Sequence, residues 1–425
     1  MLLNTSAQRY GKITLWATVA ICGIAAVAAV WYRHATVIDR PGFIDHASPG
    51  DLKAAGKDAP AIGAADTAFG LALLQNLAKK PGENVFISPF SVSQAQMLAL
   101  NGAGGKTYDQ IAAALHTPSI PFEKLNAANA ILLSGLQAPD PKVTISVANA
   151  LWIDHAYHFD PKYQQRRMDY YGAATESLDF SLPASTDHIN GWVSDHTKGR
   201  IPELVSEGDV KGSVAILTNA VYFHGTWSVE FDASKTTDSQ FWANGLTAKP
   251  IKMMSDDNDY GYLHTGDFDA IRLPYGKGRI AMYIFLPSQN DGLDSLIRSI
   301  TPAKWSRWLA QMHERDVLVN LPRFTVSEKV DLTDPLTALG MPIGPGADFS
   351  PMGLPGAYIH KVMHSTFLEV NEEGTTAAAA TADIMTMSAR EPLNIVVNHP
   401  FLCAIRDDQT GALLFVGAIR DPKTE

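Results

Sequence analysis

Histidine and carboxylate residues are the first candidates for chemistry in this sequence of 425 residues. His155 and His158 are spaced closely enough to suggest a metal pair, but a surface hairpin explains them equally well. The run 256–259, Asp-Asp-Asn-Asp, lacks the downstream Gly and Glu of a calcium loop, so we expect a solvated turn there. No G-x-S-x-G, H-E-x-x-H or C-x-x-C motif occurs. We therefore expect no metal, no cofactor and no enzymatic activity.

Four polar residues stand in otherwise apolar surroundings and need a separate explanation. They are Ser88, Ser91, Asn190 and His364. Buried polar groups in folded proteins are nearly always hydrogen-bonded. Taken singly, each of the four is interpreted as a satisfied polar group of the core.

A run of small, uncharged residues follows Glu372, Glu373 and Gly374 in the stretch 369–382, EVNEEGTTAAAATA. Alanine favours helix, threonine favours strand, and glycine permits a backbone pivot. Such a run is either a linker or a segment that can slide between two existing strands without a steric clash. Its members are Thr375, Thr376, Ala377, Ala378, Ala379, Ala380, Thr381 and Ala382.

Composition and charge indicate a globular protein that does not bind nucleic acid. Hydrophobic residues make up 46% of the chain and charged residues 18%, which suffices for a sizeable core. The net charge is −10 and no basic run occurs, whereas phosphate binding needs clustered Lys and Arg. The two cysteines, Cys22 and Cys403, lie in unrelated apolar segments, so we expect no disulfide between them.

The N-terminus carries an uncharged run over residues 13–32, preceded by Arg9 and Lys12. About twenty apolar residues suffice to span a bilayer as a helix. We favour an uncleaved signal anchor over a signal peptide that is removed near residues 26–28. The basic flank would keep the N-terminus in the cytoplasm and place the rest of the protein outside it. The predicted divisions are an N-terminal tail and anchor at 1–34, a linker at 35–62 and a globular domain at 63–425.

The globular part combines early helices with late strands. Apolar spacing predicts a helix from Asp66 to Lys80, and alternation predicts long strands over 143–153 and 213–224. Residues 395–406 and 413–418 are typical of a buried hairpin. This order indicates an α+β fold with mostly antiparallel sheets.

Several segments together resemble the serpin family. They are NVFISPFSVS at 84–93, LTNAVYFHGTWSVEF at 217–231, KVMHSTFLEVNEEGT at 361–375 and NHPFLCAIRDDQTGALLFVGAIRDP at 398–422. The resemblance implies three β-sheets, eight or nine helices and an exposed reactive-centre loop. It makes residues 372–381 the proximal hinge of that loop. It also implies that Ser88, Ser91, Asn190 and His364 meet under the large sheet as a gate.

The function that the resemblance implies is suicide inhibition of serine proteases. The target would cut the loop between Gly374 and about residue 392, and the hinge would then insert as a new strand of the large sheet. Alternate residues of a strand face the core, and with Thr375 inward the next inward positions are Ala377, Ala379 and Thr381. Asp383 would follow them, and a buried carboxylate is costly.

The resemblance implies that the target would cut a bond within 387–390. Counting forward from the hinge gives Ser388–Ala389, counting back from Asn398 gives Ala389–Arg390, and Met387 also remains open. Small or thioether side chains favour an elastase-, chymotrypsin- or subtilisin-like target, whereas Arg390 keeps a trypsin-like target open. The alternatives are a non-inhibitory serpin-like binding protein and an inhibitor of papain-like cysteine proteases. We expect a monomer.

Overall fold

The computed structural model describes residues 41–79, 82–117, 119–137, 139–243, 247–375 and 392–423. The predicted anchor at 13–32 and the predicted reactive centre at 387–390 lie outside these ranges. Within them, no helix has both the length and the apolar character that a membrane crossing requires. Arg40 to Glu425 form one compact unit.

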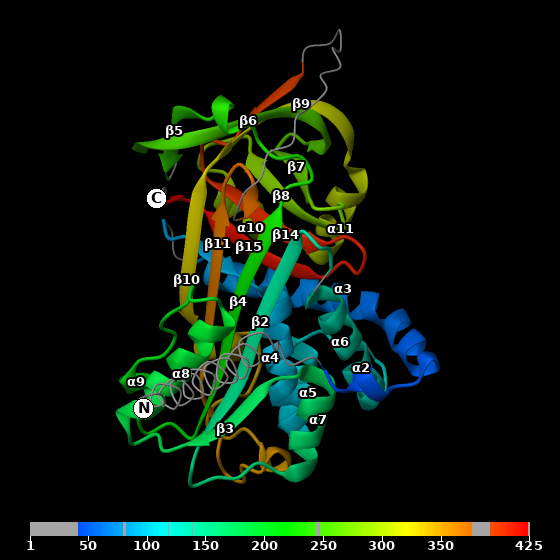
Figure 1. Cartoon of the computed structure of the whole chain (residues 1–425), viewed down its shortest axis with the longest axis vertical. Helices are drawn as coiled ribbons and strands as arrows, with labels where there is room; N and C mark the ends of the chain where they lie inside the picture. The colour runs from blue at the N-terminus through cyan, green and yellow to red at the C-terminus, as the bar shows by residue number, and fades with distance from the viewer. Residues whose placement is uncertain are drawn as a thin grey trace, which may run out of the picture. The chain divides into compact units, whose positions relative to one another are not determined.

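A six-stranded sheet forms one half of this unit (Figure 1). Its order is β10 (Phe324–Asp331), β11 (Ile359–Val370), β4 (Ala215–Thr226), β2 (Val143–Asp154) and β3 (Ala174–Leu178), with the short β12 (Gly374–Thr375) paired to β4. β11 and β4 run parallel, as do β2 and β3, whereas β10–β11 and β2–β4 are antiparallel. We call the contact between β11 and β4 the seam.

A nine-stranded sheet forms the other half. Its order is β1 (Val85–Ile87), β15 (Leu413–Ile419), β14 (Phe401–Asp407), β8 (Ile280–Pro287), β7 (Phe268–Tyr275), β6 (Thr247–His264), β9 (His313–Pro322) and β13 (Leu393–Val396), with β5 (Thr237–Ala243) beside β6. The long β6 pairs with β5 first, then β9, then β7, so it joins the second and third sheets that we expected. The predicted late hairpin corresponds to β14 and β15, whereas residues 395–396, at its predicted start, belong to β13, which pairs with β9.

The described residues contain eleven α-helices, of which eight have seven residues or more. They are α2 (Phe43–His46), α3 (Pro49–Leu77), α4 (Pro89–Gly102), α5 (Gly105–Ala114), α6 (Phe122–Gln137), α7 (Pro161–Tyr171), α8 (Pro183–His196), α9 (Glu207–Val210), α10 (Leu293–Ser299), α11 (Pro302–Gln311) and α12 (Thr333–Ala338). The α+β class is confirmed.

The prediction of a linker over 35–62 is wrong from Phe43 onward. α2 and the first fourteen residues of α3 occupy this stretch, and Ser48 caps α3 by accepting a hydrogen bond from the Asp51 N–H at 3.2 Å. Large apolar residues are sparse in this stretch because small residues make the packing contacts of the helix. A Cβ on Gly63 would lie only 2.4 Å from the Thr410 carbonyl oxygen. Close helix packing through small residues leaves no strong hydrophobic period to detect.

The prediction of a solvated turn at 256–259 is also wrong, because these residues lie inside β6. Asp256 is buried and its carboxylate accepts a hydrogen bond from the Tyr260 hydroxyl at 2.5 Å. This partner four residues along the strand satisfies a carboxylate that the sequence alone suggests is solvated.

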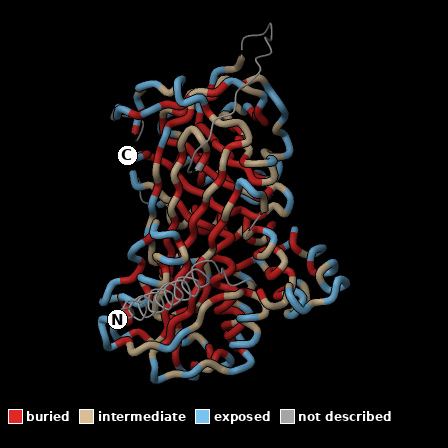
Figure 2. Tube along the Cα trace, viewed as in Figure 1, coloured by how far each residue is buried: buried red, intermediate tan, exposed pale blue. Residues whose placement is uncertain are grey.

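The two faces of the six-stranded sheet pack against different helices. On the inner face, every residue of α4 is buried and Leu217, Val221 and Phe223 of β4 join the main core. On the outer face, Ile216 and Ala220 of β4 pack in a second cluster with α8. Figure 2 shows the three central strands, β2, β4 and β11, buried along most of their length. Consecutive residues of β4 therefore face opposite helices.

Candidate functional site: a polar gate and a hinge

A row of polar side chains crosses the seam on the inner face of the six-stranded sheet. Asn149 of β2 and His364 of β11 are the register partners of Asn219 on β4. The Asn219 amide donates to Asn149 Oδ1, to Ser91 Oγ and to the Ser91 carbonyl oxygen at 3.1 Å, and its Oδ1 pairs with His364 Nδ1. Three neighbouring strands are thus linked by side chains as well as by the backbone.

The start of α4 completes this row. The Ser88 N–H donates to His364 Nε2 at 3.1 Å, and Ser88 Oγ accepts the Ser91 N–H at 3.3 Å as the helix N-cap. Because Nε2 accepts, Nδ1 carries the proton that is donated to Asn219. We call Ser88, Ser91, Asn149, Asn219 and His364 the gate.

Burial lowers the pKa of His364 to about 3, far below its ordinary value of 6.5. The side chain is fully buried, and a proton on Nε2 would face the Ser88 N–H without an acceptor. The gate therefore requires a neutral imidazole. Three of the four predicted gate residues, Ser88, Ser91 and His364, lie together in it.

Asn190 does not belong to the gate, so its predicted place there is wrong. It lies on α8, where its Oδ1 accepts the N–H groups of Leu204 and Val205 at 2.8 and 3.0 Å. Its amide donates to the Val205 carbonyl oxygen at 2.9 Å. α8 packs on the outer face of the sheet, so the sheet separates Asn190 from His364.

Asn149 and Asn219 take the place that was predicted for Asn190. Both are single amides within long apolar strands, Val-Ala-Asn-Ala-Leu and Leu-Thr-Asn-Ala-Val. A lone amide on the buried face of a strand needs a partner, and that signal could have identified them. The pairing itself depends on the register between strands, which the sequence does not state.

Acidification is expected to weaken the folded state through His364. The unfolded chain takes up its proton near pH 6.5 and the folded chain only near pH 3, so this contribution to stability falls as the pH drops between these values. Between about pH 7.5 and pH 5 the loss is about 2 kcal/mol. This loss is measured by chemical unfolding of the original protein and of His364→Gln at both pH values. The difference in unfolding free energy between the two proteins should be smaller at pH 5 than at pH 7.5 by about 2 kcal/mol.

The comparison with His364→Gln is needed because Asp66 acts in the opposite direction. Burial raises the pKa of Asp66 to about 7, so acidification below that value stabilises the fold through this residue. Asp66 is present in both proteins, and its effect therefore cancels in the difference. A gap that stays the same at both pH values would contradict the neutral, buried state of His364.

The hinge begins with a tight turn after β11. Asn371 and Gly374 exchange backbone hydrogen bonds at 2.9 and 3.2 Å, and Gly374 has a φ of +136°. A Cβ at Gly374 would lie 2.2 Å from the Gly225 carbonyl oxygen. Only glycine fits this approach, which brings the chain back alongside β4.

The two glutamates of the hinge tie this turn to the top of the sheet. The Glu373 carbonyl oxygen accepts the Trp227 N–H at 3.0 Å, and the Glu372 carbonyl oxygen accepts the Phe231 N–H at 2.8 Å. The Glu372 carboxylate accepts the Thr236 hydroxyl at 2.7 Å and lies 3.5 Å from Arg323 Nε. The start of the hinge is therefore held in a fixed position.

β12 shows the direction in which the hinge runs. It pairs antiparallel with β4, Gly374 opposite Thr226 and Thr375 opposite Gly225. β2 already occupies the other edge of β4 up to Gly225, so β12 lies on the same edge as β11. The rest of the predicted hinge, 376–381, and the predicted reactive centre, 387–390, lie outside the described residues.

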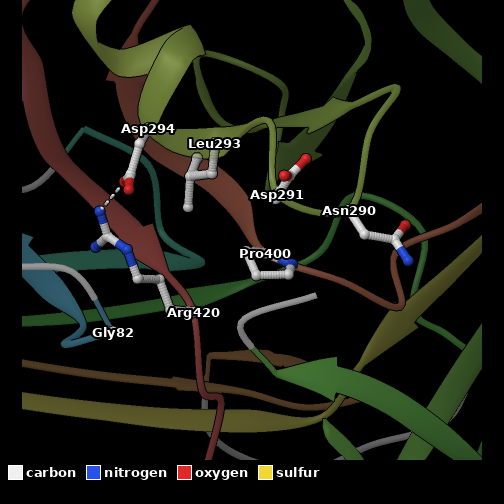
Figure 3. A pocket seen from close by; sticks show the side chains of 7 residues that line it. All are labelled: Gly82, Asn290, Asp291, Leu293, Asp294, Pro400 and Arg420. Carbon is white, nitrogen blue, oxygen red and sulfur yellow. Dashed lines mark hydrogen bonds and ion pairs between the residues drawn. The ribbon is translucent and has the colours of Figure 1, made fainter. Parts of the chain in front are cut away.

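Two other features contain none of the predicted gate or hinge residues. A pocket of about 350 Å³ is lined by Gly82, Asn290, Asp291, Leu293, Asp294, Pro400 and Arg420. In Figure 3 Arg420 and Asp294 point toward each other, and they form an ion pair at 2.5 Å. Of the two histidines weighed for a metal, His155 lies beside the carboxylates of Asp154 and Asp179 on an exposed surface, where the three could hold an ion.

Comparison with known proteins identifies the family. Residues 64–422 match the family described as Serpin (serine protease inhibitor). The leukocyte elastase inhibitor of Sus scrofa is 35% identical over 383 residues, which cover 85% of this chain and 99% of that protein. Serpin B6 of Macaca fascicularis is 35% identical over 376 residues, which cover 84% of this chain and 98% of that protein. The chain belongs to the serpin family.

Solved structures agree with this assignment. The structure of tengpin, a thermophilic serpin, in its native state superposes with a TM-score of 0.78 at 26% identity. The match covers 85% of this chain and 94% of the tengpin chain. Human thyroxine-binding globulin superposes with a TM-score of 0.79 at 24% identity. The match covers 86% of this chain and 100% of that protein, and it supports the fold alone. The expected serpin fold is confirmed.

Proposed function

We propose that this protein is a suicide inhibitor of serine endopeptidases that traps its target by inserting the cut loop at the seam. The observation that carries the proposal is the pairing of β12. The hinge already starts an antiparallel strand on the edge of β4 that β11 occupies further along. Insertion of serpin loops is an established example of strand addition, and here the added strand has its first two residues in register.

The register of β12 assigns a face to each hinge residue in the inserted strand. Continued along β4, it sets Ala377 opposite Phe223, Ala379 opposite Val221 and Thr381 opposite Asn219. Phe223, Val221 and Asn219 are fully buried, and side chains directly opposite each other share a face. The small hinge residues that we predicted to face inward would therefore enter the core without bulk, and Thr381 would reach the gate.

Energetics favour insertion once the loop is cut. β11 and β4 are parallel, and a strand that runs antiparallel between them replaces one parallel pairing by two antiparallel ones. Ten or so added backbone hydrogen bonds at about 1 kcal/mol each give on the order of 10 kcal/mol. This is comparable with the whole stability of an ordinary domain, about 5–15 kcal/mol. The uncut protein is then a kinetically trapped state.

The gate has a defined role in this proposal. Insertion separates β4 from β11, so the hydrogen bond between Asn219 and His364 has to break. A polar contact of this kind can be broken and remade, whereas an interlocked apolar seam resists separation. Removal of the His364 side chain would leave Asn219 without this partner and favour opening.

The target that we propose is an elastase-like serine protease. Met387, Ser388 and Ala389 suit a shallow apolar pocket, and the leukocyte elastase inhibitors of Sus scrofa and Mus musculus are each 35% identical to this chain. Cleavage after Arg390 by a trypsin-like enzyme is the alternative. We further propose that the protein acts as a monomer outside the cytoplasm, anchored through residues 13–32, a proposal that rests on the sequence of that segment.

Incubation with a panel of proteases tests this function. With elastase, and less with chymotrypsin, subtilisin or trypsin, we expect a complex that survives SDS and has the summed mass of protease and cut inhibitor. Its acyl bond should map to one of residues 387–390 by mass spectrometry. A protease whose catalytic serine is blocked beforehand serves as the control and should form none. If every active protease yields only nicked protein and stays active, the proposed function is wrong.

A further inference from the structure

The segment between α8 and α9 crosses the outer face of the six-stranded sheet over the seam. Lys198 Nζ lies 5.5 Å from the ring centroid of Tyr222 on β4. Two residues later, the Arg200 guanidinium lies 5.1 Å from the ring centroid of Phe367 on β11. Both are cation–π distances. The segment therefore contacts the strands on both sides of the seam.

The two aromatic residues are partners in the sheet. Tyr222 and Phe367 form the last register pair between β4 and β11, and the two strands separate beyond it. This pair lies three positions along β4 from Gly225, the partner of Thr375 in β12. A strand that extends from β12 meets this pair early, before it reaches the gate at Asn219.

The contact on the β11 side is reinforced by charge. Arg200 NH1 lies 3.5 Å from a carboxylate oxygen of Glu369, whose side chain is only 15% exposed. The backbone between the two cations is held in an unusual conformation, with a φ of +53° at Lys198 and +75° at Gly199. A non-glycine residue adopts the left-handed region where local contacts maintain it.

The segment and the start of α9 are also tied to α8 and, through two further ion pairs, to the strands on the β11 side of the seam. Asn190 on α8 holds the backbone of Leu204 and Val205 through three hydrogen bonds. Glu203 lies 3.7 Å from Lys329 of β10, and Asp209 lies 3.8 Å from Lys361 of β11. If β11 moves away from β4, the segment loses either its contacts with α8 and β4 or its contacts with β10 and β11.

We propose that Lys198 and Arg200 form a clip that keeps the last pair of the seam closed and sets the rate at which a strand can enter. The proposal rests on the function proposed above. An added strand moves β11 about 4.8 Å further from β4. A clip of two residues that contacts both strands cannot keep both contacts across that distance, so one contact has to break before the seam opens. The clip then determines whether insertion is fast enough to trap a protease.

The test measures opening of the seam without a protease. A fluorescent synthetic peptide with the sequence of residues 375–386 is added to the intact, uncut protein, and the rate of its annealing into the sheet is followed. We expect Arg200→Gln to raise this rate about fivefold, which corresponds to the loss of one partly exposed ion pair and one cation–π contact. Arg200→Lys keeps a cation and should restore part of the slow rate.

Two comparisons separate the clip from a general loss of stability. Glu369→Gln should also accelerate annealing, and the double variant should be no faster than Arg200→Gln alone, because both changes remove the same pair. Lys211→Gln is the matched control, since the Lys211 ammonium makes no ion pair with the described residues, and its rate should stay within about twofold of the original. Unfolding midpoints should be alike in all variants.

The outcomes distinguish the two proposals. If the peptide anneals to the original protein and to Arg200→Gln at the same rate, the clip is wrong and the proposed function stands. If the peptide does not anneal to either protein, the seam does not accept a strand, and both proposals are overturned.

Discussion

Replacement of Ala377 by arginine is expected to convert the protein from an inhibitor into a substrate. In the proposed inserted strand, the register of β12 would continue and set position 377 opposite Phe223, which is fully buried on the inner face of β4. An unpaired guanidinium at this position costs several kcal/mol when it is buried. Insertion then stops after the first residues, whereas cutting of the loop continues. The yield of SDS-stable complex per cut should fall at least about tenfold, measured by titration of protease activity against inhibitor.

The neighbouring position provides the control. Thr376→Arg adds the same charge to the same loop, but in the proposed inserted strand position 376 would lie opposite His224, which is only half-buried. This variant should trap its target nearly as well as the original protein. If Ala377→Arg gives an undiminished yield of covalent complex, the hinge does not insert along β4.

Cutting the loop is expected to raise the thermal stability of the protein strongly. The cut releases the hinge, and a new strand with about ten backbone hydrogen bonds joins the sheet. For a chain of this size, a gain on the order of 10 kcal/mol corresponds to a rise in melting temperature of about 12 °C. A protease that nicks within 376–391 without being trapped prepares the cut form, and calorimetry measures the shift.

The cut form of Ala377→Arg is the control for this measurement. It carries the same broken bond but cannot complete insertion, so its melting temperature should stay close to that of the uncut protein. A cut original protein that melts where the uncut protein melts would show that the described fold is already the most stable one, and the trapping mechanism would be wrong.

Both predictions depend on insertion of the hinge into the six-stranded sheet, which the sequence indicated only in part. The run of alanine and threonine after Gly374 predicted a segment that can enter a sheet, because small side chains avoid clashes on either face. The structure adds a position at which the proposed insertion would begin. β12 is held on β4 in a single register. It is held there by the Asn371–Gly374 turn, by the contacts of Glu372 and by its own pairing with β4.

The gate illustrates what local sequence omits. Ser88, Ser91 and His364 stood out as polar residues in apolar segments, and the structure brings them together through Asn219. Asn190 stood out in the same way, yet it is satisfied by the backbone of Leu204 and Val205 on the other face of the sheet. A polar residue in an apolar segment shows that a partner is needed and does not show which one.

By itself, the sequence determined the α+β class, the long strands over 143–153 and 213–224, and the hinge composition, because these depend on periodicity and side-chain size within one segment. Only the tertiary structure decided that β11 lies parallel to β4, that Asn149 and Asn219 complete the gate, and that Lys198 and Arg200 bridge the seam. These features join residues that are far apart in the chain. Their pairing is set by strand register and by the face on which each helix packs, and neither quantity is written in any single segment.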